Sequence, residues 1–217
     1  MSVDAILFDL DGTLVDSRQD LALSVQVAFE ELELPVPDFD AVIASVGHGA
    51  RHLVKVLMPE NDWDEASLDR VIGAFRAHYL EHLLDHTRPF EGLREVVEEL
   101  SAAVPLAVLT NKPGEMARRI IEGLGWDGAF RFVMGPDDAG SLKPDPVGLL
   151  NLLGRMGVEP GRAIYVGDMP IDVEVAKAAG CQSVAVTWGL AEEGAIEVSG
   201  PDRLLHQPSE LLQLIPG

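Results

Sequence analysis

Short apolar runs that stop at a polar residue or a glycine recur along this chain. Runs of four or five apolar residues, with polar residues only at their ends, are typical of strands that are buried on both faces of a parallel sheet. The pattern predicts strands at 5–8, 106–109, 132–134, 163–166 and 183–186.

Between most of these runs, apolar residues recur three and four positions apart, as they do along the buried face of an α-helix. This spacing predicts helices at 91–102, 115–124 and 145–156. Pro146 suits a first helical position, and Asp145 before it suits an N-cap. Strand and helix therefore alternate from about residue 88 to the end, which indicates an α/β fold with a parallel sheet and right-handed crossovers.

One long segment interrupts this alternation. Residues 17–32 and 65–84 have helical periodicity, and no convincing strand occurs between Asp16 and about Thr87. Ser17-x-x-Asp20 resembles a capping box at the start of the first of these helices. We therefore expect a core domain of residues 1–15 and 88–217 and an inserted all-helical cap domain of residues 16–87. An insertion that begins directly after the first strand is placed to act as a lid.

Composition limits the classes of partner. The 217 residues are 47% hydrophobic, enough for a full core, and 16 basic against 36 acidic residues give a formal net charge of -20. Such a charge repels nucleic acid and anionic lipid, so we expect neither as a partner. The single cysteine, Cys181, allows no internal disulfide and suits a reducing compartment. With no signal peptide or membrane span in the sequence, we expect a soluble, cytoplasmic protein, monomeric or homodimeric.

Two carboxylates follow the first strand, in the segment FDLDGTLVDS. Asp9 and Asp11 leave the strand on the same side, because alternate residues of a strand point the same way. Like charges this close oppose each other's ionisation. The pair therefore implies a divalent metal, a shared proton, or a division of roles between a nucleophile and an acid.

Polar residues also follow the other predicted strands. In an open parallel sheet, ligands bind outside the carboxyl ends of the strands, so these residues converge although they are far apart in the sequence. The strand ends and the loop after the third strand supply Asp9, Asp11, Gly12 and Thr13; Thr110, Asn111 and Lys112; Lys143; and Gly167, Asp168 and Asp172.

These residue types meet the needs of phosphoryl transfer, which depends on positioning and charge neutralisation. Asp9 is expected to attack phosphorus and form an acyl phosphate. Asp11 would protonate the leaving oxygen and then activate water. Oxygen ligands without a His or Cys cluster suit Mg²⁺, which Asp168 would hold and Asp172 would support. Lys143 would offset the charge of the nucleophile and of the phosphate.

Phosphate oxygens need further donors. We expect Thr110 and the amide of Asn111 to bind them, with Gly12 also part of the phosphate site. Each of these residues also has an ordinary structural interpretation as a helix cap or turn. Their joint occurrence after successive strands favours the functional one.

Four segments together resemble the motifs of the haloacid dehalogenase-like hydrolase superfamily, and in particular its phosphoglycolate phosphatase-like members: DLDGTLVDS, LTNKP, the lysine of SLKPDP, and GDMPIDVEVAKAAG. The resemblance implies a Rossmann-like core, dependence on Mg²⁺, and metal contacts from Asp9, the main-chain carbonyl of Asp11, and Asp168. True dehalogenases lack the second acidic residue, so Asp11 argues against their chemistry. Met169 stands where many relatives have a small polar residue.

The cap segment SVGHGARHLVKVL resembles the glycine-containing specificity loop of phosphoglycolate phosphatases. Exposed amides near Gly49, together with the guanidinium of Arg51, could bind a substrate carboxylate. The glycines of this segment could equally end one helix and begin the next. The other cap residues of possible chemical interest are interpreted as surface or packing residues: His48, His52, His78, His82 and His86.

The sequence therefore predicts a Mg²⁺-dependent phosphatase that acts on a small phosphorylated metabolite, 2-phosphoglycolate above others, through an aspartyl phosphate. Pyrophosphatase, sugar-phosphate phosphatase and β-phosphoglucomutase activities are alternatives within the same superfamily. A phosphorylatable signalling module that resembles a receiver domain is an alternative of another class, since it also uses an acidic pocket, Mg²⁺, a hydroxyl and a lysine.

Overall fold

The computed structural model describes residues 3–59, 64–192 and 194–215. The chain divides into two compact units, one of Met1–Asp16 with Arg88–Gly217 and the other of Ser17–Thr87. We call them the core unit and the helical unit. The first boundary falls after Asp16, one residue later than the periodicity suggests.

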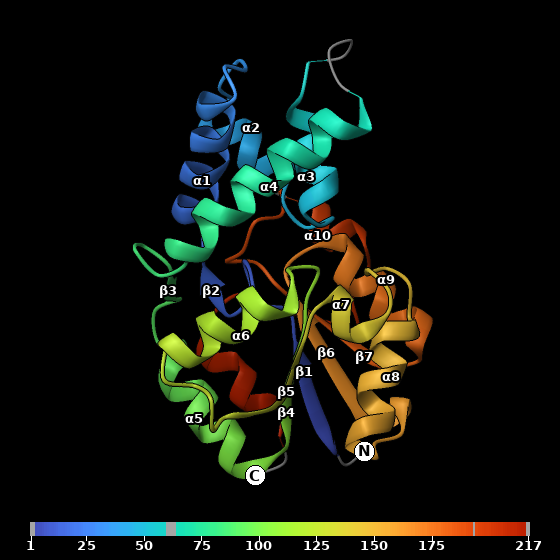
Figure 1. The fold of residues 1–217 in the computed structure, drawn as a ribbon. Coiled ribbons are helices and arrows are strands. Elements are labelled where there is room, and N and C mark those ends of the chain that lie inside the picture. Colours follow the sequence, from blue (N-terminus) through green and yellow to red (C-terminus); the bar gives the residue numbers. More distant parts are fainter. Residues whose placement is uncertain (1–2, 60–63, 193, 216–217) are drawn as a thin grey trace. The chain divides into compact units, whose positions relative to one another are not determined.

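The core unit contains a six-stranded sheet in the order β5-β4-β1-β6-β7-β8, in which every neighbouring pair is parallel (Figure 1). The five predicted strands are present, and β1 lies between β4 and β6. The sixth strand, β8, was not predicted. The strands are β1 (Ala5–Phe8), β4 (Leu106–Leu109), β5 (Phe130–Met134), β6 (Ala163–Gly167), β7 (Gln182–Val186) and β8 (Arg203–Leu205).

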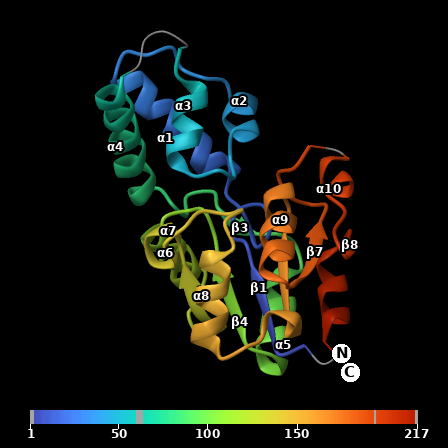
Figure 2. The same ribbon diagram turned by 90° about the vertical axis from the view of Figure 1, so that its right-hand side faces the viewer.

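Helices cover both faces of this sheet (Figure 2). On one face α8 packs beside α9, and on the other α5 packs beside the 3₁₀ helix η2. The helices of the core unit are α5 (Leu93–Ala103), α6 (Gly114–Gly123), α7 (Pro136–Ala139), α8 (Val147–Met156), α9 (Pro170–Ala179) and α10 (Ala195–Val198), with 3₁₀ helices η1 (Pro160–Arg162) and η2 (Pro208–Leu214).

The sequence of strand β1 has no apolar–polar alternation, and the packing of the strand explains why. Ala5 and Leu7 belong to the cluster that packs under α8 and α9. Phe8 contacts the edge of the Phe130 ring, with centroids 6.3 Å apart. All four residues of β1 are fully buried. Apolar residues are therefore favoured at each position of the strand, because both of its faces are in the core.

The helical unit consists of four helices in its described part, and it contains no strand there. Helices α1 and α4 pack together through apolar faces that include Val25, Phe29, Val71 and Phe75. Asp38 caps α2 by accepting a hydrogen bond from the Ala41 amide. The helices are α1 (Arg18–Glu31), α2 (Phe39–Ala44), α3 (Ala50–Leu57) and α4 (Glu65–Glu81).

The expected capping box at Ser17 and Asp20 is wrong. Ser17 precedes α1, but its side chain makes no capping hydrogen bond. The buried Asp20 carboxylate instead accepts hydrogen bonds from the Thr87 amide at 2.7 Å and the Thr87 hydroxyl at 2.8 Å, and from the His86 amide at 3.0 Å. Asp20 therefore links the start of the helical unit to its end by hydrogen bonds. In the core unit, the two-residue strands β2 (Val15–Asp16) and β3 (Arg88–Pro89) pair antiparallel.

Within the described residues, none of the helices is both long enough and apolar enough to cross a membrane.

Candidate active site

Several predicted site residues of the core unit follow three adjacent strands. Asp9 follows β1, Thr110 follows β4 and Asp168 follows β6, and the sheet order places β1 between the other two. Because all three strands are parallel, their carboxyl ends lie at one edge of the sheet, and polar side chains converge there.

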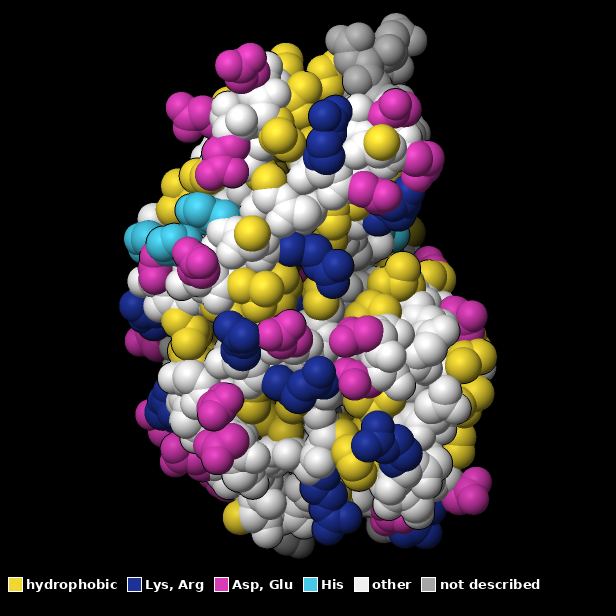
Figure 3. Space-filling view, viewed as in Figure 1, with side chains coloured by type: hydrophobic (Ala, Val, Ile, Leu, Met, Phe, Trp, Pro, Cys, Tyr) yellow, Lys and Arg dark blue, Asp and Glu magenta, His cyan; other side chains and the backbone are white. Residues whose placement is uncertain are grey.

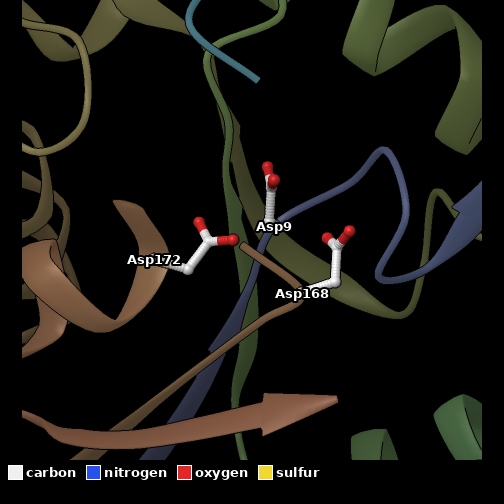
Figure 4. A group of neighbouring side chains, drawn as sticks. All are labelled: Asp9, Asp168 and Asp172. Atoms are coloured by element: carbon white, nitrogen blue, oxygen red, sulfur yellow. The ribbon is translucent and has the colours of Figure 1, made fainter. Parts of the chain in front are cut away.

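Three carboxylates form the centre of this site (Figure 4). Asp9, Asp168 and Asp172 each offer an oxygen, and these oxygens lie within 4.8 Å of one another. In Figure 4, Asp9 extends from the end of β1 while Asp168 and Asp172 lie on either side of it. All three residues are buried. Such a cluster is stable only with compensating positive charge, because burial and mutual repulsion both oppose ionisation.

Lys143 supplies part of that charge. Its Nζ lies 2.9 Å from Asp9 Oδ2 and 2.6 Å from Asp172 Oδ1. Burial alone would lower the pKa of the Lys143 ammonium, but the carboxylates of Asp172 and Asp9 outweigh burial and hold this pKa well above the usual lysine value. Lys143 is therefore charged at neutral pH and fixes the Asp9 carboxylate, as its predicted role requires.

Asp168 is held by neutral donors. The Thr13 hydroxyl donates to its Oδ1 and the Leu190 amide donates to its Oδ2, each at 2.7 Å. Burial, followed by repulsion from Asp172 and Asp9, raises the pKa of the Asp168 carboxyl to about 8. Ionisation of Asp168 at neutral pH therefore calls for a further cation, which a bound metal would provide.

One oxygen of the cluster is available to such a cation. Asp9 Oδ1 is buried and has no hydrogen-bond partner among the described residues. An orphaned buried carboxylate oxygen is costly unless a ligand satisfies it. The donor set is made of oxygen alone, which suits a hard ion such as Mg²⁺. These observations fit the predicted metal site.

Asp172 contacts Lys143 and the start of α9, and its predicted support of Asp168 or of a metal-bound water stays a prediction. Its Oδ1 accepts from Lys143, and its Oδ2 accepts from the Met169 amide at 3.0 Å. Burial raises the pKa of the Asp172 carboxyl to about 6, although Lys143 opposes this shift. Both oxygens thus serve to orient Lys143 and to hold the start of α9.

Asp11 lies apart from the three-carboxylate cluster and pairs with a lysine to which we had assigned no role. Its Oδ2 is 3.2 Å from Lys112 Nζ, and the Lys112 side chain is buried. A separate, partly exposed carboxylate suits the acid–base role predicted for Asp11. The position of Lys112 in the loop that follows β4 was the available signal.

Asn111 and Thr110 organise the loops around Lys143. The Asn111 side chain accepts from the Lys143 amide at 2.8 Å and donates to the Lys143 carbonyl at 3.2 Å. The Thr110 hydroxyl accepts from the Lys112 amide at 3.2 Å. The Asn111 side chain thus joins the loop after β4 to the loop that carries Lys143, while phosphate binding by the Asn111 amide and Thr110 stays a prediction.

Gly12 has a structural role at the site, and its predicted phosphate contact stays a prediction. Its amide donates to the Val15 carbonyl at 2.9 Å, so this donor is already used within the loop. Its φ of +82° favours glycine, and a Cβ at this position would collide with the Asp168 carboxylate. The need for Gly12 is therefore steric.

The loop after β7 contributes residues that sequence reasoning missed. The Trp188 indole donates to the Thr13 carbonyl at 3.1 Å, and a Cβ at Gly189 would collide with Asp168. The Leu190 amide reaches the same carboxylate. The signal was their position: the rule that polar groups converge after parallel strands applies to β7 as well.

The predicted substrate residues of the helical unit lie at the start of α3. Gly49 has a φ of +86° and immediately precedes the helix. The Arg51 guanidinium pairs with the carboxylates of Glu65 and Asp69, at 2.9 Å to the latter. Arg51 is thus already paired within its own unit, and its contact with substrate stays a prediction.

Comparison with known proteins agrees with this geometry. Residues 6–186 match the model of the haloacid dehalogenase-like hydrolase family. The chain belongs to this family. It is 35% identical to the phosphoglycolate phosphatase of Aquifex aeolicus (strain VF5), over 97% of this chain and 95% of the relative. It is 34% identical to the phosphoglycolate phosphatase of Escherichia coli (strain K12), over 97% and 91%.

A solved structure has the same fold. A predicted phosphoglycolate phosphatase from Haemophilus somnus 129pt superimposes with a TM-score of 0.91 at 31% identity, covering 99% of this chain and 98% of that one. The Rossmann-like fold class expected from the motifs is thereby confirmed, and the relatives make this member of the family a phosphatase.

Proposed function

We propose that this phosphatase hydrolyses 2-phosphoglycolate with Mg²⁺ and an aspartyl-phosphate intermediate on Asp9. The observation that carries the chemistry is the buried Asp9 carboxylate, which has one oxygen paired with Lys143 and the other without a partner. The names of the relatives at 34–35% identity support the choice of substrate.

The proposed reaction has two steps, and the residues have distinct roles in them. A carboxylate oxygen of Asp9 attacks phosphorus, and the bond from phosphorus to the ester oxygen breaks while Asp11 gives that oxygen its proton. Asp11 then takes a proton from water, whose oxygen attacks phosphorus and releases inorganic phosphate and free Asp9. Lys143 keeps Asp9 ionised and offsets charge on the phosphoryl group.

Further residues orient the phosphate. The Thr110 hydroxyl and the Asn111 amide would donate to its oxygens. Asp9, Asp168 and the Asp11 carbonyl would hold Mg²⁺, which when bound supplies positive charge between the carboxylates and the phosphate. Thr13 and Leu190 keep Asp168 in place for this purpose.

The proposed partner is a small phosphorylated metabolite, with neither nucleic acid nor membrane as a substrate. Its carboxylate would be bound by Arg51 and by amides near Gly49, so that the helical unit selects the substrate. Arg51 would then share or leave its ion pairs with Glu65 and Asp69. A monomer or homodimer in the cytoplasm accords with this role.

The test is phosphate release by the purified protein from 2-phosphoglycolate, pyrophosphate, glucose 1-phosphate and an aryl phosphate. We expect the highest kcat/KM for 2-phosphoglycolate. A clear preference for one of the other esters would replace the proposed substrate but leave the chemistry intact. Stable phosphorylation of the protein without turnover would instead indicate a signalling module.

The prediction for Asp9 tests the chemistry itself. Asp9→Asn keeps the shape of the side chain but removes the nucleophile, so kcat should fall by roughly 10³-fold or more on every ester. Asp127→Asn, the same change at an exposed position of the core unit, serves as the control and should leave kcat unchanged. If the Asp9 variant is folded by circular dichroism and keeps more than about a tenth of kcat, Asp9 is not the nucleophile.

A further inference from the structure

A ring of hydrogen bonds holds the Asp168 carboxylate between two loops of the core unit. The Thr13 hydroxyl, in the loop after β1, donates to Asp168 Oδ1, and the Leu190 amide, in the loop after β7, donates to Asp168 Oδ2, each at 2.7 Å. The indole of the half-buried Trp188 donates to the Thr13 carbonyl at 3.1 Å. Because Trp188 and Leu190 lie on the same loop, this third bond closes the ring. The proposed phosphatase reaction gives Trp188 no role.

Trp188 reaches across the end of a strand to make this bond. In the sheet order, β6 lies between β1 and β7. Neighbouring strands are about 4.8 Å apart, so the loops after β1 and β7 start from strand ends separated by roughly twice that distance. Tryptophan suits such a span, because its large flat ring turns about only two side-chain bonds and its N–H group only donates. The indole therefore helps to set the separation of the two loops.

The backbones of these two loops contact the side chain of Asp168 directly. A Cβ added to Gly12, in the loop after β1, would collide with the Asp168 carboxylate, and so would a Cβ added to Gly189, in the loop after β7. Asp168 therefore lies in a slot whose two walls have no room for a methyl group. Because close-packed groups transmit small displacements, a change in the separation of the loops moves the carboxylate.

Packing alone does not hold the loop after β7 against Asp168. A hollow of about 210 Å³ lies beside the loop and is lined by Asp168, Gly189 and Ala191, among others. The loop therefore has space into which it can move. The hydrogen bonds donated by Trp188 and Leu190 oppose this movement, and the bond from Trp188 does so without using a lone pair of Asp168.

We propose that Trp188 is a positioning residue of the metal site, whose bond to Thr13 keeps Asp168 in the geometry that Mg²⁺ requires and so makes the site selective for Mg²⁺ over Ca²⁺. This inference rests on the proposed metal site at Asp9 and Asp168. Mg²⁺ demands near-ideal octahedral geometry with short bonds, whereas Ca²⁺ accepts longer bonds and a flexible arrangement of ligands. An Asp168 carboxylate that is less firmly held therefore disfavours Mg²⁺ more than Ca²⁺.

The test is titration of the full-length protein with Mg²⁺ and, separately, with Ca²⁺, followed through the backbone amide resonances around Asp168 in nuclear magnetic resonance spectra. Trp188→Phe keeps an aromatic ring but removes the N–H group. Loss of a group that supports a metal ligand typically weakens metal binding by about 10- to 100-fold. Because Trp188 acts through Thr13, we expect the lower end of this range, a rise of about 10-fold in the Kd for Mg²⁺. The Kd for Ca²⁺ should change by less than about threefold.

A second tryptophan provides the matched control. Trp126 is buried in the core unit, and its indole nitrogen has no hydrogen-bond partner among the described residues. Trp126→Phe makes the same chemical change without removing a hydrogen bond, so it should leave both Kd values unchanged. Acidic side chains are spread over both units in Figure 3, so both ions also bind weakly outside the site. Asp168→Asn removes the proposed ligand and measures this background.

A double variant tests whether Trp188 acts through the ring of hydrogen bonds. Thr13→Val removes the hydroxyl that donates to Asp168, so it breaks the same ring at another bond and should also weaken Mg²⁺ binding. Adding Trp188→Phe to Thr13→Val should then cost little more than the larger of the two single losses, because coupled groups are not additive. Fully additive losses would show that the two bonds act separately, which contradicts the proposal.

The indole resonances of the wild type keep the test decisive if the Trp188 variant folds poorly. Binding of Mg²⁺ should shift the indole N–H resonance of Trp188 and slow its exchange with solvent, and it should leave the resonance of Trp126 in place. An unchanged Trp188 resonance under saturating Mg²⁺ would overturn the proposal without any substitution.

The outcomes separate this inference from the proposed function. Unchanged Mg²⁺ affinity in Trp188→Phe, or equal losses of affinity for Mg²⁺ and Ca²⁺, would overturn the role of Trp188 and leave the proposed phosphatase reaction standing. A wild type that binds Mg²⁺ no better than Asp168→Asn does would show that the proposed metal site is wrong, and the inference would fail with it.

Discussion

Lys143 faces the carboxylates of Asp9 and Asp172 from a fully buried position, and its removal would leave them facing each other. Breaking a buried ion pair by removing one partner typically costs about 3–5 kcal/mol of stability. We therefore expect Lys143→Met to destabilise the metal-free protein by about this amount in urea unfolding at neutral pH, and to lower kcat as well.

The pH dependence separates this effect from a simple packing defect. The raised pKa of Lys143 means that its contribution is complete at pH values below the ordinary lysine value of 10.5 and is lost only above it. In the variant, the carboxylates left without a cation bind protons more tightly in the folded state, so stability should recover as the pH falls toward about 5. Lys177→Met, at an exposed lysine, is the control and should show neither effect.

Gly189 illustrates how closely the backbone approaches Asp168. A methyl group at this position would collide with the Asp168 carboxylate, which the next residue, Leu190, holds by its amide. Gly189→Ala should therefore displace Asp168, weaken Mg²⁺ binding and reduce kcat by about 10-fold or more, as expected when a metal ligand loses its support. Gly128→Ala has open space around it and should keep wild-type kinetics. Equal Mg²⁺ dependence in both variants would contradict this role.

The residues of the site differ in how far the sequence could predict them. Asp9, Asp168 and Lys143 could be predicted from the sequence, because charged groups after apolar strands have few structural reasons to be there. The steric need for Gly12 and Gly189 could not be predicted from the sequence, since it depends on which carboxylate packs against each glycine. The pairing of Asp11 with Lys112 could not be predicted either, because the sequence does not show how two side chains at one edge of a sheet are oriented.

At the scale of elements, the long buried strands and the amphipathic helices were predictable and the short elements were not. Strands β1 and β4 have the predicted bounds, because a strand with both faces in the core is apolar throughout. Strand β8 has three residues, and β2 and β3 have two each. Each of these short strands forms because the fold brings a partner strand beside it. Its own sequence therefore shows no periodicity that would predict a strand.

Asp20 is a further example, because its role joins two elements that are distant in sequence. Burial raises the pKa of this carboxyl, but hydrogen bonds from His86 and Thr87 outweigh burial and lower it below the ordinary value of 3.8. Asp20→Asn should lower the stability of the helical unit by about 1–3 kcal/mol, since charged hydrogen bonds are lost and a buried group is left poorly satisfied.

The sign of the pH effect follows from the lowered pKa. The carboxylate stabilises the folded state above pH 3.8 and loses this effect as the pH falls through its folded value. The difference in stability between wild type and Asp20→Asn should thus be constant near neutral pH and shrink below about pH 4. Chemical denaturation monitored by helical circular dichroism measures it, with Asp40→Asn on exposed α2 as the control. A difference that grows in acid would show that the carboxylate is not stabilising.

At the scale of the whole molecule, a formal net charge of -20 means that any cation stabilises the fold to some extent. A specific Mg²⁺ site must be distinguished from this general screening. The carboxylates Asp9, Asp168 and Asp172 all belong to the core unit, whereas acidic residues occur in both units. Screening should therefore stabilise both units. Binding of Mg²⁺ at the site should oppose only those opening motions that disrupt the core unit.

Hydrogen exchange under Mg²⁺ is the corresponding experiment. A ligand at 100 times its Kd stabilises the states that hold its site by about 2.7 kcal/mol, and amides exchange through openings of separate regions. Saturating Mg²⁺ should thus slow exchange in β1 and β6, which carry the site, more than in α1 and α4, whose local openings leave the carboxylates in place. Potassium chloride at equal ionic strength should not discriminate between the units. Asp168→Asn should abolish the extra protection of the core, while Asp40→Asn, which changes the net charge equally, should retain it. Uniform protection of both units, unaffected by Asp168→Asn, would show that Mg²⁺ acts here through screening rather than through the proposed site.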